Sequence, residues 1–452
     1  MSSAEPPVLP PPAPHRGDRP AAVPEPPSSV VVVGGGLAGA QTVGALRRRG
    51  YAGRVTLLGA EGVPPYDRPP LSKELLSRPR PAWLAEDLGV DVEALADEVR
   101  LADPAVRLDR RSAPEGGSWE VTTRSGERRA TDAVVLAVGS TPVRPAGWEH
   151  ARLLHTARDA EDLRGALRPG LRLVIVGAGW IGAELAGVAT GAGARVTVLE
   201  AAPTPLRRQL GPGVGAHLAP WYAAVGAELV TGAAVAEVRP DGVRLADGRE
   251  LAADLVLAAV GARPATDWLD GAVPRDVRGS VPVDATGAVR GLDGLWAVGD
   301  CATREHPVLG AVPGGHWSAA LHDPDATVAA MLGDEDTGPG HAPYVFSQQL
   351  GHDLALFGVP DEADDVLFRG DPSGGTTSHE GWAAFYLPPG SHVGATSDAA
   401  PDGRVTEVRA VLLVDSPRDV GPVRKAMNRT GRLRVDLDVA LDPTRRLRDA
   451  LA

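Results

Sequence analysis

Cysteine is almost absent from this sequence: the only one among 452 residues is Cys301. A single cysteine excludes an internal disulfide, a redox-active dithiol, a four-thiolate zinc site and an iron–sulfur cluster held by this chain alone. The 11 histidines show no ligand spacing such as H-E-x-x-H, so no metal site is predicted. Cys301 follows Asp300, whose charge would raise the pKa of the thiol, and we interpret Cys301 as a buried small residue. Redox chemistry would therefore need a bound cofactor or a partner.

Aromatic residues, basic charge and long apolar runs are also scarce. The chain has 9 Trp, 5 Tyr and 4 Phe, so its core must consist mostly of Ala, Val and Leu. The 58 acidic residues outnumber the 46 basic ones, and the formal net charge of −12 argues against binding to nucleic acid or to an anionic membrane. The sequence has no apolar run of 18 residues and no signal-peptide pattern. We therefore expect a cytoplasmic protein.

Residues 1–29 contain ten prolines and no periodic apolar face. Such a segment cannot bury enough apolar surface to offset the entropy lost on ordering, so we interpret it as a disordered tail. A proline motif that docks a partner is the alternative. The rest of the chain is long enough for two to four domains.

A strand, a glycine turn, a helix and a second strand are predicted from Val30 onward, and the same succession recurs from Leu171. The glycines of the two turns match: Gly34, Gly36 and Gly39 in the first copy, and Gly177, Gly179 and Gly182 in the second. In such a turn one glycine permits the bend, one lets the backbone approach a pyrophosphate, and one lets helix and strand pack closely. The duplication therefore predicts two dinucleotide-binding units.

The strands that follow each copy end in a glycine, Gly139 and Gly261, and both are expected to return to a sheet. We predict an α/β fold with two doubly wound dinucleotide-binding domains plus a smaller α+β C-terminal domain. The expected segments are a flavin domain at 30–149, a nicotinamide domain at 150–269, the second part of the flavin domain at 270–339 and the C-terminal domain at 340–452.

Glu200 ends the second strand of the second copy. A carboxylate there accepts hydrogen bonds from a ribose and repels a 2′-phosphate, which favours NADH over NADPH. Arg207 and Arg208 follow closely and could bind a phosphate instead. In the first copy the matching position is Gly59, and Glu61 is the nearest acid.

The segments PPYDRPPLSKELL (64–76) and LWAVGDCA (295–302), with the two glycine turns, resemble the FAD-dependent ferredoxin reductases of the putidaredoxin reductase type. These proteins have the pyridine nucleotide-disulfide oxidoreductase fold without the redox disulfide, and the resemblance runs from about Val30 to Arg429. It implies FAD in the first unit and NADH (NAD) in the second. It also implies two sets of cofactor-binding residues, which are Gly34, Gly36, Ala38, Gly39, Glu61, Arg68, Lys73, Val106, Gly139, Asp300 and Trp317 for FAD, and Gly177, Gly179, Ile181, Gly182, Glu200 and Gly261 for NAD.

The resemblance further implies an ion pair between Lys73 and Glu184 beside the flavin, and we predict that these two residues take part in catalysis. An opposite charge is needed because a lone charge beside a desolvated ring system is costly. The alternative is that Glu184 only complements the N-terminus of its own helix.

Several positions depart from the family pattern. We expect these departures to affect the choice of partner more than the binding of FAD. Pro324 interrupts an Ala-rich helical pattern, where a kink or an early stop is expected. The other departures are Ala60, His155, Gly315, Phe346 and Gln348.

The implied function is an NADH-dependent ferredoxin reductase that passes electrons from NADH through FAD to a [2Fe–2S] ferredoxin serving a haem monooxygenase or a Rieske oxygenase. An NADH oxidase or small-molecule reductase is one alternative, and an NADH-responsive interaction flavoprotein resembling apoptosis-inducing factor is another. The basic stretch 423–434 could dock an acidic iron–sulfur protein or simply be solvated. The chain is expected to be a monomer or a homodimer.

Overall fold

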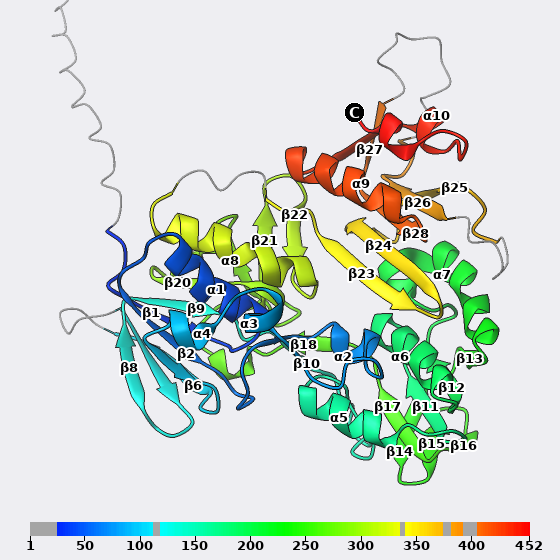
Figure 1. The fold of residues 1–452 in the computed structure, drawn as a ribbon, viewed down its shortest axis with the longest axis horizontal. Coiled ribbons are helices and arrows are strands. Elements are labelled where there is room, and N and C mark those ends of the chain that lie inside the picture. The colour runs from blue at the N-terminus through cyan, green and yellow to red at the C-terminus, as the bar shows by residue number, and fades with distance from the viewer. Residues whose placement is uncertain (1–24, 112–117, 335–339, 374–380, 392–404) are drawn as a thin grey trace, which may run out of the picture.

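The computed structural model describes residues 25–111, 118–334, 340–373, 381–391 and 405–452. Most of the expected proline-rich tail, up to residue 24, lies outside these ranges. Two parallel sheets and one antiparallel sheet form three units that meet near the centre of Figure 1. Within the described ranges, no helix has the length and apolar character needed to cross a membrane.

The first domain is built on a parallel sheet with the strand order β20-β9-β1-β2-β5. Helices cover one face of this sheet, and three antiparallel strands cover the other. The sheet strands are β1 (Ser29–Val33), β2 (Arg54–Leu58), β5 (Glu98–Arg100), β9 (Ala133–Leu136) and β20 (Leu295–Ala297). The covering elements are α1 (Leu37–Arg48), α4 (Val92–Leu95), α8 (Trp317–Met331), β6 (Ala105–Arg110), β7 (Trp119–Thr123) and β8 (Arg128–Thr131).

Strand β1 shows why the sequence has four consecutive valines. Val30 and Val32 belong to the core beneath α1 and α8, whereas Val31 and Val33 belong to the core beneath β6, β7 and β8. A strand buried on both faces needs a continuous apolar run rather than an alternating one. The valine run therefore places β1 at the centre of its sheet.

Shorter elements complete the first domain. They are β3 (Tyr66–Asp67), α2 (Pro70–Lys73), β4 (Ala82–Trp83), α3 (Leu84–Asp87), η1 (Asp267–Leu269), β19 (Val281–Val283), η2 (Gly299–Cys301), β21 (Ala302–His306) and β22 (Gly310–Pro313).

The second domain repeats the same plan on a parallel sheet with the order β13-β12-β11-β17. An antiparallel sheet of β14, β15 and β16 covers one face, and α6 packs on the other. Its elements are α5 (Ala157–Ala166), β11 (Arg172–Val176), α6 (Trp180–Gly191), β12 (Arg195–Glu200), α7 (Arg207–Ala224), β13 (Glu228–Thr231), β14 (Val235–Arg239), β15 (Gly242–Leu245), β16 (Glu250–Ala252) and β17 (Leu255–Ala258). The chain leaves and re-enters the first domain through β10 (Ser140–Pro142) and β18 (Ala262–Pro264), which pair antiparallel.

The C-terminal domain holds a five-stranded antiparallel sheet with the order β23-β24-β28-β26-β25. One face of this sheet shares a core with α6 and α7 of the second domain, and α9 covers the other face. The sheet is therefore a layer between two helical layers (Figure 1). Its elements are β23 (Tyr344–Gln349), β24 (His352–Gly358), β25 (Asp365–Arg369), β26 (Trp382–Leu387), β27 (Val405–Val408), β28 (Ala410–Val414), α9 (Pro417–Thr430), β29 (Leu433–Asp436), α10 (Leu437–Ala440) and η3 (Leu447–Ala450).

Of the two outcomes expected at Pro324, a kink or an early stop of helix α8, the early stop does not occur. The helix continues through Pro324, which is buried, and ends at Met331. Proline costs a helix one backbone hydrogen bond. Here the following turn packs Val328 and Ala329 into the protein, with α8 lying against α1, and this packing maintains the helix beyond the proline.

Candidate functional site

The first glycine turn lies between β1 and α1 and has the shape of a phosphate cradle. Gly34 has a φ of +124°, and a Cβ there would lie 2.0 Å from the carbonyl oxygen of Ala137. A Cβ at Gly39 would lie 1.8 Å from the Gly34 oxygen, so both positions require glycine. A Cβ at Gly36, the N-cap, would meet nothing within 4 Å, and no side chain caps α1. Unpaired helix N–H groups that face open space are the donors that a pyrophosphate needs.

The second glycine turn has the same geometry between β11 and α6. Gly177 has a φ of +105°, and a Cβ there would lie 2.5 Å from the oxygen of Ala259. A Cβ at Gly182 would lie 2.0 Å from the Gly177 oxygen, whereas Gly179 at the N-cap faces open space. Both turns therefore fit an extended dinucleotide.

Segments far apart in the sequence converge on the first turn. The 3-10 helix η2 places Gly299 against α1, where an added Cβ would lie 3.0 Å from that of Ala38. Asp300 accepts hydrogen bonds from Ser140 Oγ (3.0 Å) and the Gly315 amide (3.2 Å), and burial raises its pKa. This half-buried carboxylate retains lone pairs for further donors, and the hydroxyls of a ribityl chain are suitable ones.

Trp317 begins α8 and connects it to the segment before α2. Its Nε1 donates to Asp67 Oδ1 at 2.9 Å, and burial is the main cause of the raised pKa of Asp67. Gly139, with a φ of +67°, follows β9 toward the same region. The first domain thus collects predicted FAD residues from four separate segments.

Lys73 and Glu184 form the expected ion pair. Lys73 Nζ, at the end of α2, lies 2.8 Å from Glu184 Oε1 on α6, and the Glu184 side chain is only 2% exposed. Glu184 is the fifth residue of α6, and its carboxylate contacts Lys73 rather than the free amides at the helix start. Capping of its own helix is therefore not its main interaction.

Two serines that sequence reasoning did not single out complete this cluster. Ser72 Oγ donates to Glu184 Oε2 at 2.5 Å, and Ser347 Oγ on β23 donates to Oε1 at 2.6 Å. Ser72 stands beside Lys73 in the L-S-K segment, and Ser347 lies within the PYVFSQQ segment. Both lay in family-like segments, but only the tertiary structure places them on the same carboxylate.

Glu200 is held in place at the end of β12. Its two carboxylate oxygens accept the amides of Ala178 and Ala202, each at 2.8 Å. Arg207 pairs with Glu362 of the C-terminal domain at 3.0 Å, and Arg208 is exposed. The carboxylate is therefore fixed beside the second glycine turn, and Arg207 already has another partner.

Glu61 and Arg68 contact each other instead of standing free. Arg68 Nη2 lies 3.0 Å from Glu61 Oε2, and Tyr66 donates its hydroxyl to the same carboxylate. Arg68 also donates to the carbonyl oxygen of His155. This cluster joins β3 to the start of α5, and contact with FAD remains a prediction for both residues.

Two predicted contacts are apolar side chains left at the surface. Val106 on β6 is 42% exposed, and Ile181 on the first turn of α6 is 45% exposed. Gly261, with a φ of +111°, follows β17, which runs parallel to β11. It therefore lies at the edge of the second sheet where the second glycine turn begins. Burial of these exposed apolar side chains by a cofactor remains a prediction, and of the two only Ile181 lies directly at a glycine turn.

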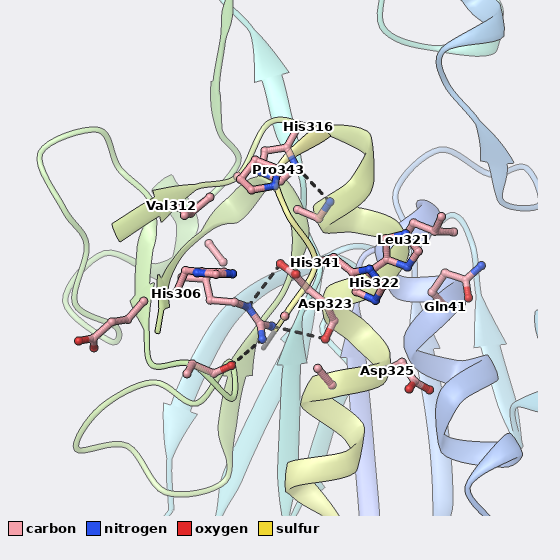
Figure 2. Close-up of a pocket in the computed structure, with 18 of the residues that line it drawn as sticks. Gln41, His306, Val312, His316, Leu321, His322, Asp323, Asp325, His341 and Pro343 are labelled. Atoms are coloured by element: carbon pink, nitrogen blue, oxygen red, sulfur yellow. Dashed lines mark hydrogen bonds and ion pairs between the residues drawn. The ribbon is translucent and has the colours of Figure 1, made fainter. Parts of the chain in front are cut away.

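A separate cavity of about 520 Å³ lies between α1, α8 and β21 (Figure 2). None of the predicted site residues is among the described residues that line it. Its arginines are paired: Arg304 lies 3.4 Å from Asp323, and Arg49 lies 2.6 Å from Asp325. Burial lowers the pKa of His316 and His322 to about 4. The cavity is therefore distinct from the nucleotide turns.

Cys301 is fully buried, and its thiol donates to the carbonyl oxygens of Leu136 and Val298 at 3.3 Å. Burial raises the pKa of this thiol to about 11, so the interpretation of Cys301 as a packing residue is confirmed. In the part of the chain that the structure describes, no three His, Cys, Asp or Glu residues gather as a metal site.

Comparison with known proteins gives consistent matches. The family model described as pyridine nucleotide-disulphide oxidoreductase matches residues 28–322. The ferredoxin–NAD(+) reductase component of the biphenyl dioxygenase system of Paraburkholderia xenovorans (strain LB400) is 34% identical over 369 residues, covering 77% of this chain and 85% of that protein.

Two crystal structures resemble most of the chain. Fdr9 gives a TM-score of 0.78 at 34% identity and covers 93% of this chain and 99% of its own. The covalent putidaredoxin reductase–putidaredoxin complex gives a TM-score of 0.76 at 25% identity, with 93% of this chain and 97% of that one covered. These matches confirm the predicted fold class and resemblance, and the chain belongs to the pyridine nucleotide-disulphide oxidoreductase family.

Proposed function

We propose that this protein is an NADH-dependent flavoprotein ferredoxin reductase. The observation that carries the proposal is the Lys73–Glu184 ion pair, which joins the domain of the first glycine turn to the domain of the second. A pair at this junction is suited to a reaction between groups held by the two turns. The chain has no redox cysteine pair, so a bound cofactor must accept the electrons.

The residues present fit FAD in the first domain and NADH in the second. Near the first turn lie the unpaired amides at the start of α1 and the Asp300 carboxylate. Near the second lie the corresponding amides at the start of α6 and the Glu200 carboxylate. FAD, when bound, supplies the chemistry of accepting a hydride from NADH and releasing electrons one at a time.

The chain's own residues position and stabilise the reacting groups. Glu184 holds the ammonium group of Lys73 at a defined place, and a fixed positive charge stabilises negative charge that develops nearby in a transition state. Trp317, which the resemblance assigns to the border of the flavin, is held by the hydrogen bond from its Nε1 to Asp67. No residue is required to act as a general acid or base.

The electron acceptor is proposed to be a [2Fe–2S] ferredoxin that serves a haem monooxygenase or a Rieske oxygenase. The named relatives and the putidaredoxin complex support this acceptor. Helix α9 presents the exposed basic residues Lys425 and Arg429, which could attract an acidic partner. The alternatives are an NADH oxidase and an NADH-responsive interaction flavoprotein.

The test is an assay of purified protein with NADH against a panel of ferredoxins, with oxygen and a quinone as competing acceptors. We expect a yellow, FAD-containing protein that reduces at least one ferredoxin faster than either small acceptor. Protein that binds no flavin, or that reduces oxygen or quinone at full rate and no ferredoxin, would refute the proposal.

A further inference from the structure

The carboxylate of Glu184 receives donors from two other parts of the molecule. Lys73 and Ser72 belong to α2 of the first domain, Glu184 belongs to α6 of the second, and Ser347 belongs to β23 of the C-terminal domain. We infer that Ser347 is a positioning residue for hydride transfer, which acts by orienting Glu184 and through it Lys73. This inference rests on the proposed function, because it concerns the rate of flavin reduction by NADH.

The hydrogen bonds fix the carboxylate by both of its oxygens. Oε1 is shared by Lys73 (2.8 Å) and Ser347 (2.6 Å), and Oε2 is taken by Ser72 (2.5 Å). An ionised carboxylate only accepts hydrogen bonds, so each serine hydroxyl must be the donor. Charge-assisted bonds of this kind are short and strong. The carboxylate cannot turn without breaking at least one of them.

Ser347 itself is held rigidly. The residue is 1% exposed, and its backbone pairs with Leu354 in the sheet. Just beyond it, a Cβ added at Gly187 of α6 would lie 3.1 Å from the Leu350 amide nitrogen. Helix α6 therefore approaches the end of β23 as closely as a glycine permits, and this contact keeps the hydroxyl beside Glu184.

The other two donors cannot replace this contact. Lys73 and Ser72 are neighbours on a helix of four residues, so they move together with α2. Among the described residues, Ser347 is the one donor to Glu184 that comes from outside α2. It thus fixes the carboxylate relative to the C-terminal domain, and that domain contributes to the hydride-transfer site.

Removal of the hydroxyl should leave Lys73 paired but less well placed. Small misplacements of a catalytic group slow a reaction strongly, and we expect flavin bleaching by NADH in Ser347→Ala to slow about tenfold. The affinity for NADH should change by less than about twofold, because no contact to the second glycine turn is altered.

Anaerobic stopped-flow reduction of the FAD-loaded protein by NADH separates these two quantities. Ser347→Cys keeps the shape of the side chain with a larger atom in place of oxygen and loses a strong donor, and it should be as slow as Ser347→Ala. Ser347→Thr keeps the hydroxyl and should restore the rate. Thr430→Ala is the matched control, because it deletes an exposed hydroxyl whose hydrogen-bond partners are backbone groups of Ala426 in α9 and of Arg432 just after it, and not Glu184. If Ser347→Ala fails to fold, Ser347→Cys serves as the test variant.

A double-mutant cycle with Lys73→Met decides whether Ser347 acts through the ion pair. The effects of substituting two residues that act as one unit do not add, so the Ser347 variants should slow flavin bleaching only slightly in the Lys73→Met background. A normal bleaching rate in Ser347→Cys, or an equal loss with and without Lys73, would overturn the inference. Wild-type protein that binds FAD and is not bleached by NADH would instead overturn the proposed function.

Discussion

The two glycine turns share one backbone geometry but have different surroundings. In both, the first glycine has a positive φ and the third lies against the oxygen of the first. In the second domain the acid at the strand end, Glu200, is held by two backbone amides beside the turn. In the first domain the matching position is Gly59, and the nearby Glu61 pairs with Arg68. We therefore propose that each turn binds the pyrophosphate of its own dinucleotide, and that the neighbouring residues decide which dinucleotide each turn holds.

Alanine at the open N-cap glycines should affect the two cofactors separately, FAD through one turn and NADH through the other. A Cβ at Gly36 or Gly179 meets nothing in the protein, so each variant should fold, while the methyl group occupies the space next to the free amides. We expect Gly36→Ala to weaken FAD retention by about tenfold or more and Gly179→Ala to raise the KM for NADH without loss of FAD. Flavin absorbance after gel filtration and NADH titration would measure the two effects. Loss of FAD in Gly179→Ala would contradict this assignment.

Lys73→Met tests the ion pair at the junction of the two domains. Removal of a charge that acts in the transition state should slow flavin bleaching by about a hundredfold, with a smaller effect on NADH binding. The variant leaves Glu184 without its cation, so Lys73→Met/Glu184→Gln serves as the control for destabilisation. An unchanged bleaching rate in Lys73→Met would remove the electrostatic role.

Glu200→Ala tests the specificity of the second turn. Loss of one charge-assisted contact worth about 1.5–3 kcal/mol should narrow the preference for NADH over NADPH by about tenfold to a hundredfold. The ratio of kcat/KM for the two coenzymes measures the effect. Arg208→Ala is the paired variant, because Arg208 is exposed next to the helix start. If the wild type used NADPH more efficiently, the specificity assignment to Glu200 would be wrong.

The smallest expected effect concerns the basic face of α9. Lys425→Ala and Arg429→Ala should each lower the rate of ferredoxin reduction a few-fold at low salt, and the difference from wild type should shrink as salt rises, because exposed charges are screened. Flavin reduction by NADH should be unaffected. Equal rates for wild type and variants at low salt would mean that this face is only solvated.

Several features of the two glycine turns and their surroundings could be predicted from residues that are close together in the sequence. Local spacing and short apolar runs predicted the glycine turns, their strands and the burial of Cys301. A strand–turn–helix unit is specified by neighbouring residues. The Lys73–Glu184 pair was predicted from the resemblance. A kink or an early stop was expected at Pro324, and the early stop was wrong, because the packing of Val328 and Ala329 and the contact between α8 and α1 maintain the helix.

The sequence by itself determined the duplicated nucleotide units, the need for a bound redox cofactor and the acid at the end of β12. Each depends on residues close together along the chain or on the absence of a residue type. Only the tertiary structure decided that Ser347 donates to Glu184, that Arg207 pairs with Glu362, and that the C-terminal sheet shares a core with α6 and α7. These contacts join residues more than 150 positions apart in the first two cases. Their geometry depends on how whole sheets and helices pack, which no local pattern encodes.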